Sequence, residues 1–277
     1  MKPISTRVAR ADEGENAFRG YAVNAELAGR TRWATAFSLA IGGPRLNDDD
    51  AALVEDLAVC SLAADPRIWP LKMARLVASY GVTLPAIAVG HLALEGAIVG
   101  AEPTKRAAET LLEWSACVGE SPGPDRVEDL LEDLLSKGRA AGFGVAFRPR
   151  DERVEGIKAS LAARNRTGGR HWRLVTALDA LMAEKKKVQL NLAMASAAVL
   201  LDLGFDPAQI RSWMSAFLDV CFYANASEES VLQSSSLREL PASCIEYVGP
   251  APRLSPRAEA KRTLDSQAPA LIEPAFR

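Results

Sequence analysis

Two histidines are the side chains of this sequence best suited to acid–base chemistry, because imidazole titrates near neutral pH. His91 lies in the apolar helical pattern 85–98, which favours a hydrogen-bonded histidine in a core or an interface over a catalytic one. His171 stands between Arg170 and Trp172 at a basic and aromatic helix start. It could contact a ligand or lie on a solvated face.

Two arginines, Arg148 and Arg150, flank a proline shortly after the turn sequence Gly142-Phe143-Gly144. Guanidinium groups match the geometry of phosphate oxygens, so this pair could contact a phosphate group. Ordinary surface charge is the alternative.

Apolar residues three and four positions apart predict helices along most of the chain. The ranges are 48–64, 70–80, 85–98, 104–117, 127–141, 152–164, 171–184, 191–203 and 207–226. Asp125 precedes one of these helices, Gly142 follows it, and Pro85 opens another, as helix ends require. No convincing alternating strand pattern appears, so the sequence predicts an all-α protein.

Asn191 stands where the helix 191–203 begins. Its amide could orient a bound carbonyl, and capping of the helix N-terminus explains the residue equally well.

Composition argues against nucleic acid, a membrane and a metal ion as binding partners. The formal net charge of −2 provides no positive field for nucleic acid. No apolar run approaches the roughly 20 residues of a membrane span, and the first residues lack a signal-peptide pattern, so a cytoplasmic protein is predicted. The four cysteines lack the short paired spacing of zinc or redox motifs, so we expect reduced, mostly buried thiols and no metal site.

Several short segments, in order along residues 18 to 253, resemble the citrate synthase and citryl-CoA lyase family. They are Phe18-Arg19-Gly20-Tyr21 with the helix that ends before Gly42-Gly43-Pro44, Arg75-Leu76-Val77-Ala78-Ser79, Gly142-Phe143-Gly144, Asp151 with Arg153, Asn191-Leu192-Ala193, and Tyr247-Val248-Gly249-Pro250. The length is similar to that of the shorter, citryl-CoA lyase-like branch.

The resemblance implies a multi-helix fold with a large domain, 18–100 and 188–250, and a small domain, 101–187. Residues 1–17 and 251–277 are expected to be tails. The helices 70–80 and 85–98 are apolar on more faces than one core contact needs. We therefore expect a homodimer, or a heterodimer with a citrate synthase-like chain, that buries them.

The family's reactive side chains fall on residues that cannot perform its chemistry. Its histidines fall on Val99 and Val145, an arginine on Ala146 and the aspartate base on Ala193, while a late histidine appears as Asn225. Forming an enol needs a base at the carbon acid and a donor at the developing oxyanion, and the aligned side chains supply neither. The family reaction by the family mechanism is therefore not expected.

Two functions stay open. The first is a non-catalytic protein that binds an acyl-CoA or a partner, with a coenzyme A thioester as ligand and no other cofactor. The second is a repurposed synthase or lyase that makes or breaks a carbon–carbon bond in a less polar acyl-CoA substrate, using groups such as His91, Asn191 or Asn225. An apolar site would select against dicarboxylates.

Overall fold

We describe the protein from a computed structural model, which defines residues 4–95, 99–119, 123–136, 142–233, 241–250 and 255–260. The chain divides into two units, Met1–Leu237 and Arg238–Arg277, and each is described by itself.

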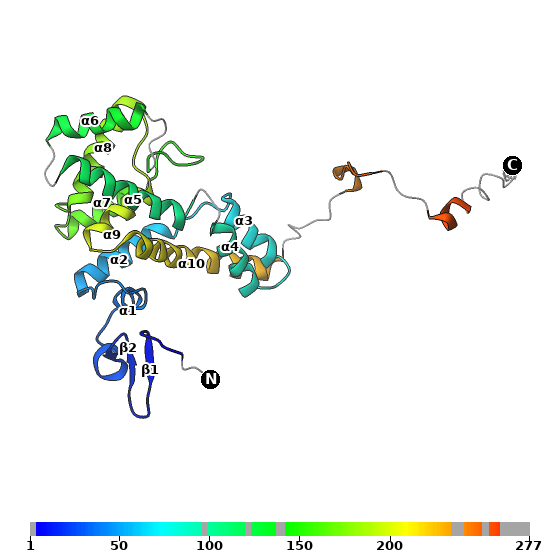
Figure 1. The fold of residues 1–277 in the computed structure, drawn as a ribbon, viewed down its shortest axis with the longest axis horizontal. Helices are drawn as coiled ribbons and strands as arrows, with labels where there is room; N and C mark the ends of the chain where they lie inside the picture. Colours follow the sequence, from blue (N-terminus) through cyan, green and yellow to red (C-terminus); the bar gives the residue numbers. More distant parts are fainter. Residues whose placement is uncertain are drawn as a thin grey trace. The chain divides into compact units, whose positions relative to one another are not determined.

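The first unit is built mainly of helices (Figure 1). They are α1 Trp33–Ala40, α2 Asp48–Ser61, α3 Trp69–Ala78, α4 Leu84–Glu95, α5 Ala101–Val118, α6 Pro124–Ser136, α7 Arg153–Ala163, α8 Arg170–Lys186, α9 Leu192–Asp202 and α10 Pro207–Leu232. Each range in which periodicity predicted a helix overlaps one, and the all-α class is confirmed. The expected helix ends at 96–98 and 137–141 lie outside the described residues.

A small antiparallel sheet precedes the helices. Its strands are β1 Ala9–Ala11, β2 Asn16–Phe18 and β3 Tyr21–Ala22, in the order β1-β2-β3, and a π-helix, η1 Val23–Leu27, follows. The prediction of a tail over 1–17 missed this sheet, because strands of two or three residues are too short to show an alternating pattern.

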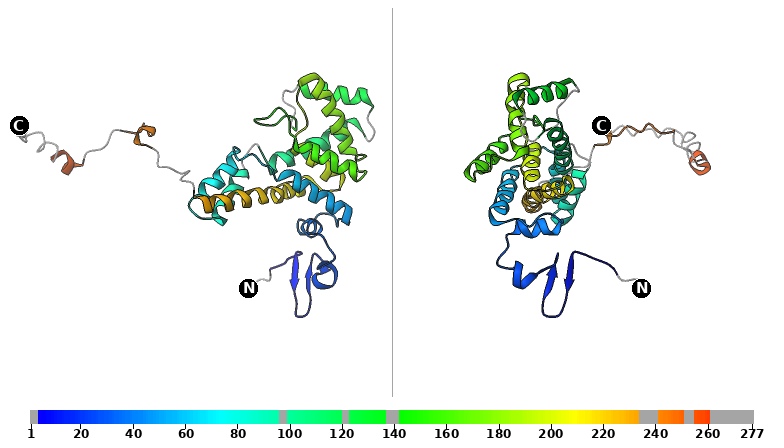
Figure 2. Two further views of the ribbon diagram at one scale, coloured as in Figure 1. Left: turned by 180° about the vertical axis from the view of Figure 1, so that it is seen from behind. Right: turned by 60° about the vertical axis from the view of Figure 1, so that its left-hand side comes forward.

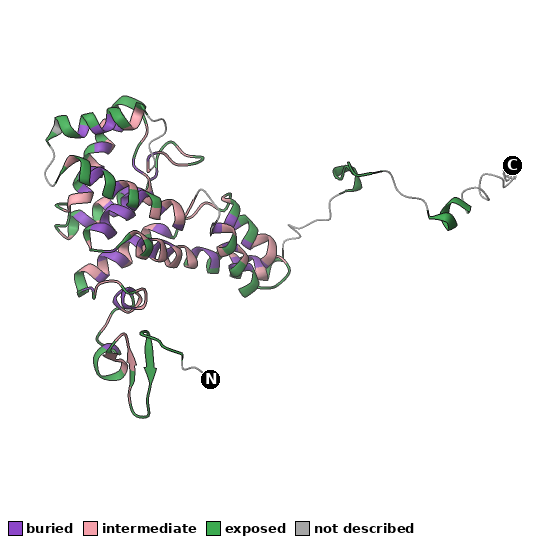
Figure 3. Ribbon diagram, viewed as in Figure 1, coloured by how far each residue is buried: buried purple, intermediate pink, exposed green. Residues whose placement is uncertain are grey.

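The larger core cluster is centred on α9, where every residue from Met194 to Leu201 is buried (Figure 3). This helix contacts α2, α5, α7, α8 and α10. Such a pattern, apolar on all sides, is that of a helix enclosed by others. At its N-terminus Asn191 caps the helix, and at its C-terminal end Phe205 packs edge-on against Trp213 of α10.

A second core cluster joins α3, α4 and the C-terminal half of α10, which lie together in the left view of Figure 2. Gly90 makes this packing possible. A Cβ atom added there would lie 2.6 Å from the Phe222 ring and 3.2 Å from Cβ of Ala74, so the three helices meet at a position without a side chain.

The second unit contains a 3-10 helix, η2 Ala242–Cys244, and a helical turn at 256–260. Its large apolar side chains Ile245, Tyr247 and Val248 are exposed. The unit begins at Arg238, inside the range 188–250 that the sequence assigned to a large domain. The division of the first unit into a large and a small part stays a prediction.

All four cysteines are unpaired, but only Cys221 is buried, so the expectation of mostly buried thiols is wrong. Cys117 lies on an exposed face of α5 and Cys244 in the second unit. Every helix within the described ranges is too short or too polar to cross a membrane.

Candidate functional site

The turn Gly142-Phe143-Gly144 lies against the start of α9, so two of the segments singled out in the sequence meet. Phe143 forms a bridge with Leu190, the Gly144 N–H donates to the Gln189 carbonyl at 2.7 Å, and the Asn191 N–H donates to the Gly142 carbonyl at 3.0 Å. Gly142 has φ +89°, and a Cβ there would lie 2.5 Å from the Met194 side chain. The close approach of loop and helix therefore requires glycine.

Asn191 holds this junction with both ends of its amide. Its Oδ1 accepts the Met194 N–H at 3.1 Å, which caps α9, and its Nδ2 donates to the Gly144 carbonyl at 3.0 Å. The capping interpretation is confirmed. Since both polar atoms are engaged within the chain, a bound carbonyl would have to compete with these contacts.

Three residues to which the sequence resemblance assigns reactive positions lie at this junction, and all three have hydrocarbon side chains. Val145 and Ala146 directly follow the turn, and Ala193 is the second residue of α9. Val145 and Ala193 are partly buried and Ala146 is exposed. None of the three can take up or release a proton.

A buried ion pair anchors the far end of the loop. Asp151, whose side chain is 1% exposed, binds the Arg153 guanidinium through two contacts of 2.7 Å. It also accepts a hydrogen bond at 2.9 Å from the backbone N–H of Leu192, which is the first residue of α9. Burial acts to raise the pKa of Asp151, but the hydrogen bonds and charge of Arg153 and the N–H of Leu192 outweigh it, so the pKa lies below its usual value.

A second Asp-x-Arg pair lies beside the same loop. Arg67 binds Asp65 at 2.7 Å and covers the ring of Phe147, with 4.8 Å from guanidinium carbon to ring centroid. The hydrogen bonds from Arg67 lower the pKa of Asp65 to about 2, and the charge of Arg148 contributes. Segment 65–67 therefore lies close to 147–148. Phe147 itself is exposed and has φ +67°, an uncommon conformation for an aromatic residue.

Arg148 and Arg150, the two arginines predicted to contact a phosphate, have different surroundings. Arg148 forms an ion pair with Glu152, and its side chain is 24% exposed. Arg150 is exposed. Arg150 is thus the more accessible cation of this loop, while phosphate contact by Arg148 would replace or share its bond to Glu152.

His91, Asn225 and Val99 lie beside the second core cluster. The His91 Nε2 lies 2.8 Å from Asp219 Oδ1, and its ring packs on Phe222 with centroids 4.7 Å apart, which confirms a hydrogen-bonded histidine. The pair lines an open hollow of about 380 Å³ beside Trp33. Val99, two residues before the start of α5, packs on the same cluster.

Asn225 is held by an ion-pair network between α3 and α10. It accepts a hydrogen bond from Arg75 at 3.2 Å and donates to the Cys221 carbonyl at 2.9 Å. Arg75 also binds the buried carboxylate of Glu229 at 2.6 Å. The Asn225 amide thus has a structural role.

Burial raises the pKa of the Cys221 thiol, while a backbone hydrogen bond and the charge of Arg153 act in the opposite direction. Sequence reasoning missed the Asp65–Arg67 pair and Asp219. A repeated Asp-x-Arg spacing, at 65–67 and 151–153, is the signal that could have identified both arginine pairs.

His171 does not lie on a solvated face, and ligand contact by its ring stays a prediction. Its side chain is 13% exposed, and its Nδ1 lies 2.8 Å from Asp202 Oδ1. In the described part of the chain, no three His, Cys, Asp or Glu side chains are placed to hold a metal ion.

No family model matches the sequence, and the search of curated proteins finds none that match. Solved structures do match. Citryl-CoA lyase from Hydrogenobacter thermophilus matches with a TM-score of 0.75 and 23% identity, over 94% of this chain and 100% of that chain.

Two longer proteins match as well. An ATP citrate lyase from Methanosaeta concilii, in complex with (3S)-citryl-CoA, has a TM-score of 0.72 and 16% identity over 91% of this chain and 43% of that one. Citrate synthase from Thermotoga maritima has a TM-score of 0.58 and 21% identity over 78% and 57%. The chain spans less than two thirds of these two proteins. Their similarity and that of the lyase show that this chain has the citrate synthase-like fold shared by citrate synthases and citryl-CoA lyase.

Proposed function

We propose that this protein is a non-catalytic relative of citrate synthase and citryl-CoA lyase that binds an acyl-CoA thioester or a protein partner. The observation that carries the proposal is the junction of loop 142–151 with α9. Its backbone hydrogen bonds and its Asp151–Arg153 pair are in place, while Val145, Ala146 and Ala193 beside them are hydrocarbon. Each missing acid, base or oxyanion donor would cost about 10²- to 10⁴-fold in rate.

The ligand class comes from the neighbouring structures. One ATP citrate lyase is in complex with (3S)-citryl-CoA and another with citrate and coenzyme A. For this chain we propose a CoA thioester whose phosphates meet Arg150 and Arg148. Without the family's arginine at Ala146, a citrate or oxaloacetate carboxylate would lack a partner there.

A thiol-release assay with acetyl-CoA and oxaloacetate, and the reverse cleavage of citryl-CoA, tests the catalytic half of the proposal. We expect no turnover above background. A rate near ~1 s⁻¹, at the low end of ordinary enzymes, would show that these residues have been wrongly assigned.

Calorimetry tests the binding half. We expect CoA to bind the wild type, and the Arg148→Ala/Arg150→Ala protein to bind it more weakly, with a larger difference at low salt than at high salt. Arg7→Ala/Arg10→Ala removes two exposed charges from the N-terminal segment and is the matched control. Equal affinity in all three proteins would count against the phosphate contact.

A repurposed enzyme is the second candidate. The observation that favours it is the apolar character of Val145 and Ala193 next to a polar loop, which suits a less polar acyl group. Thermal-shift measurements with acetyl-CoA and longer acyl-CoAs test it, because a ligand of the native state raises the apparent melting temperature. A larger shift for longer acyl chains, together with thiol release from them, would favour this candidate over the first.

We further propose that the protein acts in the cytoplasm as a homodimer, or as a heterodimer with a citrate synthase-like chain. Four unpaired cysteines are compatible with a reducing compartment. The helices α3 and α4 expose Met73, Leu84 and Leu92, which is more apolar surface than a monomer needs.

A further inference from the structure

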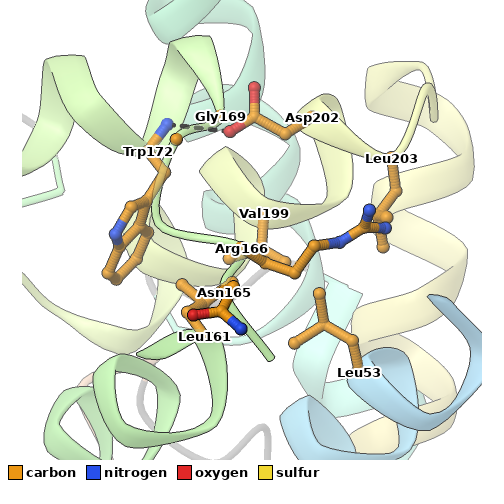
Figure 4. Close-up of a pocket in the computed structure, with 10 residues that line it drawn as sticks. Leu53, Leu161, Asn165, Arg166, Gly169, Trp172, Val199, Asp202 and Leu203 are labelled. Carbon is orange, nitrogen blue, oxygen red and sulfur yellow. Dashed lines mark hydrogen bonds between the residues drawn. The ribbon is translucent and has the colours of Figure 1, made fainter. Parts of the chain in front are cut away.

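A hollow of about 280 Å³ lies apart from the loop–α9 junction, among α2, α7, α8 and α9 (Figure 4). Leu53, Leu161, Trp172 and Val199 form its apolar walls, and each of these side chains is at most 4% exposed to solvent. A cavity of about 150 Å³ with such walls suffices for benzene, so this hollow has room for a bicyclic ring.

The loop between α7 and α8 leaves the hollow open. Asn165 has φ +56°, and Gly168 follows with no side chain. Gly169 packs so tightly that an added Cβ would lie 2.0 Å from Oδ2 of Asp202, so the chain cannot place a side chain of its own there.

Asp202 is one of the polar residues that line the hollow, together with Asn165 and Arg166. Its Oδ1 accepts the backbone N–H of His171 at 2.9 Å and contacts its ring, and its Oδ2 accepts the Trp172 N–H at 2.9 Å (Figure 4). A carboxylate oxygen can accept two hydrogen bonds, so Oδ2 has capacity for one more donor.

The cation at the mouth is already neutralised. Arg166, which also lines the hollow, forms ion pairs with Asp50 and, at 3.9 Å, with Asp49. An anionic ligand would have to compete with both carboxylates. The walls and the free capacity of Asp202 favour a neutral aromatic ring that carries a hydrogen-bond donor.

We propose that this hollow is a binding site for a small bicyclic aromatic molecule with one N–H or O–H donor, its ring against Trp172 and Val199 and its donor directed at Asp202. The site is separate from the proposed acyl-CoA site, so neither proposal depends on the other.

Ligand-observed NMR with indole on the full chain tests the proposal. We expect saturable binding in the low millimolar range or tighter. Indene, which has the same shape without the N–H, should bind at least about fivefold more weakly, because a hydrogen bond to a carboxylate is lost. Absence of saturable indole binding overturns the proposal, and equal affinity for indole and indene overturns the role of Asp202.

Variants locate the site. Leu203→Trp fills the mouth and should abolish indole binding, whereas Leu112→Trp, on the exposed face of α5, should leave it unchanged. Val199→Leu adds one methylene to the hollow and serves if the first variant folds poorly; it should weaken indole binding with no loss of melting temperature. Unchanged affinity in both Leu203→Trp and Val199→Leu would place indole elsewhere and overturn the proposal.

Discussion

Two aspartates in this protein each bind an arginine two positions further along the chain. Because the two ion pairs differ in burial, they should contribute differently to stability. Asp151 and Arg153 have side chains 1% and 15% exposed, and the carboxylate also ties α9 to the loop. Arg67, the partner of Asp65, is 62% exposed. Solvent screens an exposed pair, so a low pKa does not by itself indicate a large contribution to stability.

Asp151→Asn should therefore lower the free energy of unfolding by about 2–3 kcal/mol at neutral pH, because it leaves Arg153 without a charged partner in a buried setting. The pKa of Asp151 is lowered on folding, so its stabilisation is present above the unfolded value of about 4 and is lost as the pH falls through the folded pKa. Urea denaturation as a function of pH measures this, and the acid limb should be flatter in Asp151→Asn.

Asp65→Asn is the control for that measurement, since it removes a pair of the same spacing. We expect a clearly smaller loss of stability. Equal losses in the two variants would mean that burial does not separate the two pairs.

At the scale of elements, the start of α9 depends on one side chain that performs two tasks. Asn191→Ala should cost about 1–2 kcal/mol of stability for the lost cap, plus a further loss for the tether to Gly144. Asn47→Ala removes the cap of α2, where the side chain accepts the Asp50 N–H at 2.8 Å. It should lose only the stability that a cap contributes, because Asn47 does not bind the 142–151 loop. Thermal melts by circular dichroism compare the two, and a smaller effect at Asn191 would contradict the dual role.

The crossing of α4 with α10 gives a second test at this scale. Gly90→Ala should destabilise the protein by about 1–3 kcal/mol although alanine favours helices, because its Cβ meets the Phe222 ring. In a Phe222→Leu background the same change should cost less. A double-mutant cycle from chemical denaturation measures the coupling, and strict additivity would contradict the contact.

The helices were predictable from the sequence because their apolar period and their caps are local signals. The C-terminal end of α10 could not be predicted in this way. The apolar pattern ends at residue 226, but the helix continues to Leu232, where the buried Glu229 binds Arg75. The same limit applies to the site. The Asn191 cap is a local feature, whereas the partners of His91 and Asn225, Asp219 and Arg75, lie 128 and 150 positions away.

For the molecule as a whole, the exposed apolar faces of α3 and α4 predict a dimer. Light scattering at micromolar concentration should give twice the mass of the chain, and Leu92→Asp, at a side chain 73% exposed, should shift the equilibrium to monomer without lowering helix content. Val59→Asp, on an exposed face of α2, is the control. A wild-type mass of about 30 kDa would contradict the assembly.

The length of α10 has a consequence for how the first unit unfolds. Its 26 residues span roughly 39 Å, and they supply Trp213 and Phe217 to one core cluster and Cys221 and Phe222 to the other. Each core cluster holds one half of α10 in place. If either cluster unfolds, α10 therefore cannot stay fully formed. Backbone amides in α9 and in α3 should therefore exchange with deuterium through one shared opening event, and a denaturant should release both sets at the same midpoint.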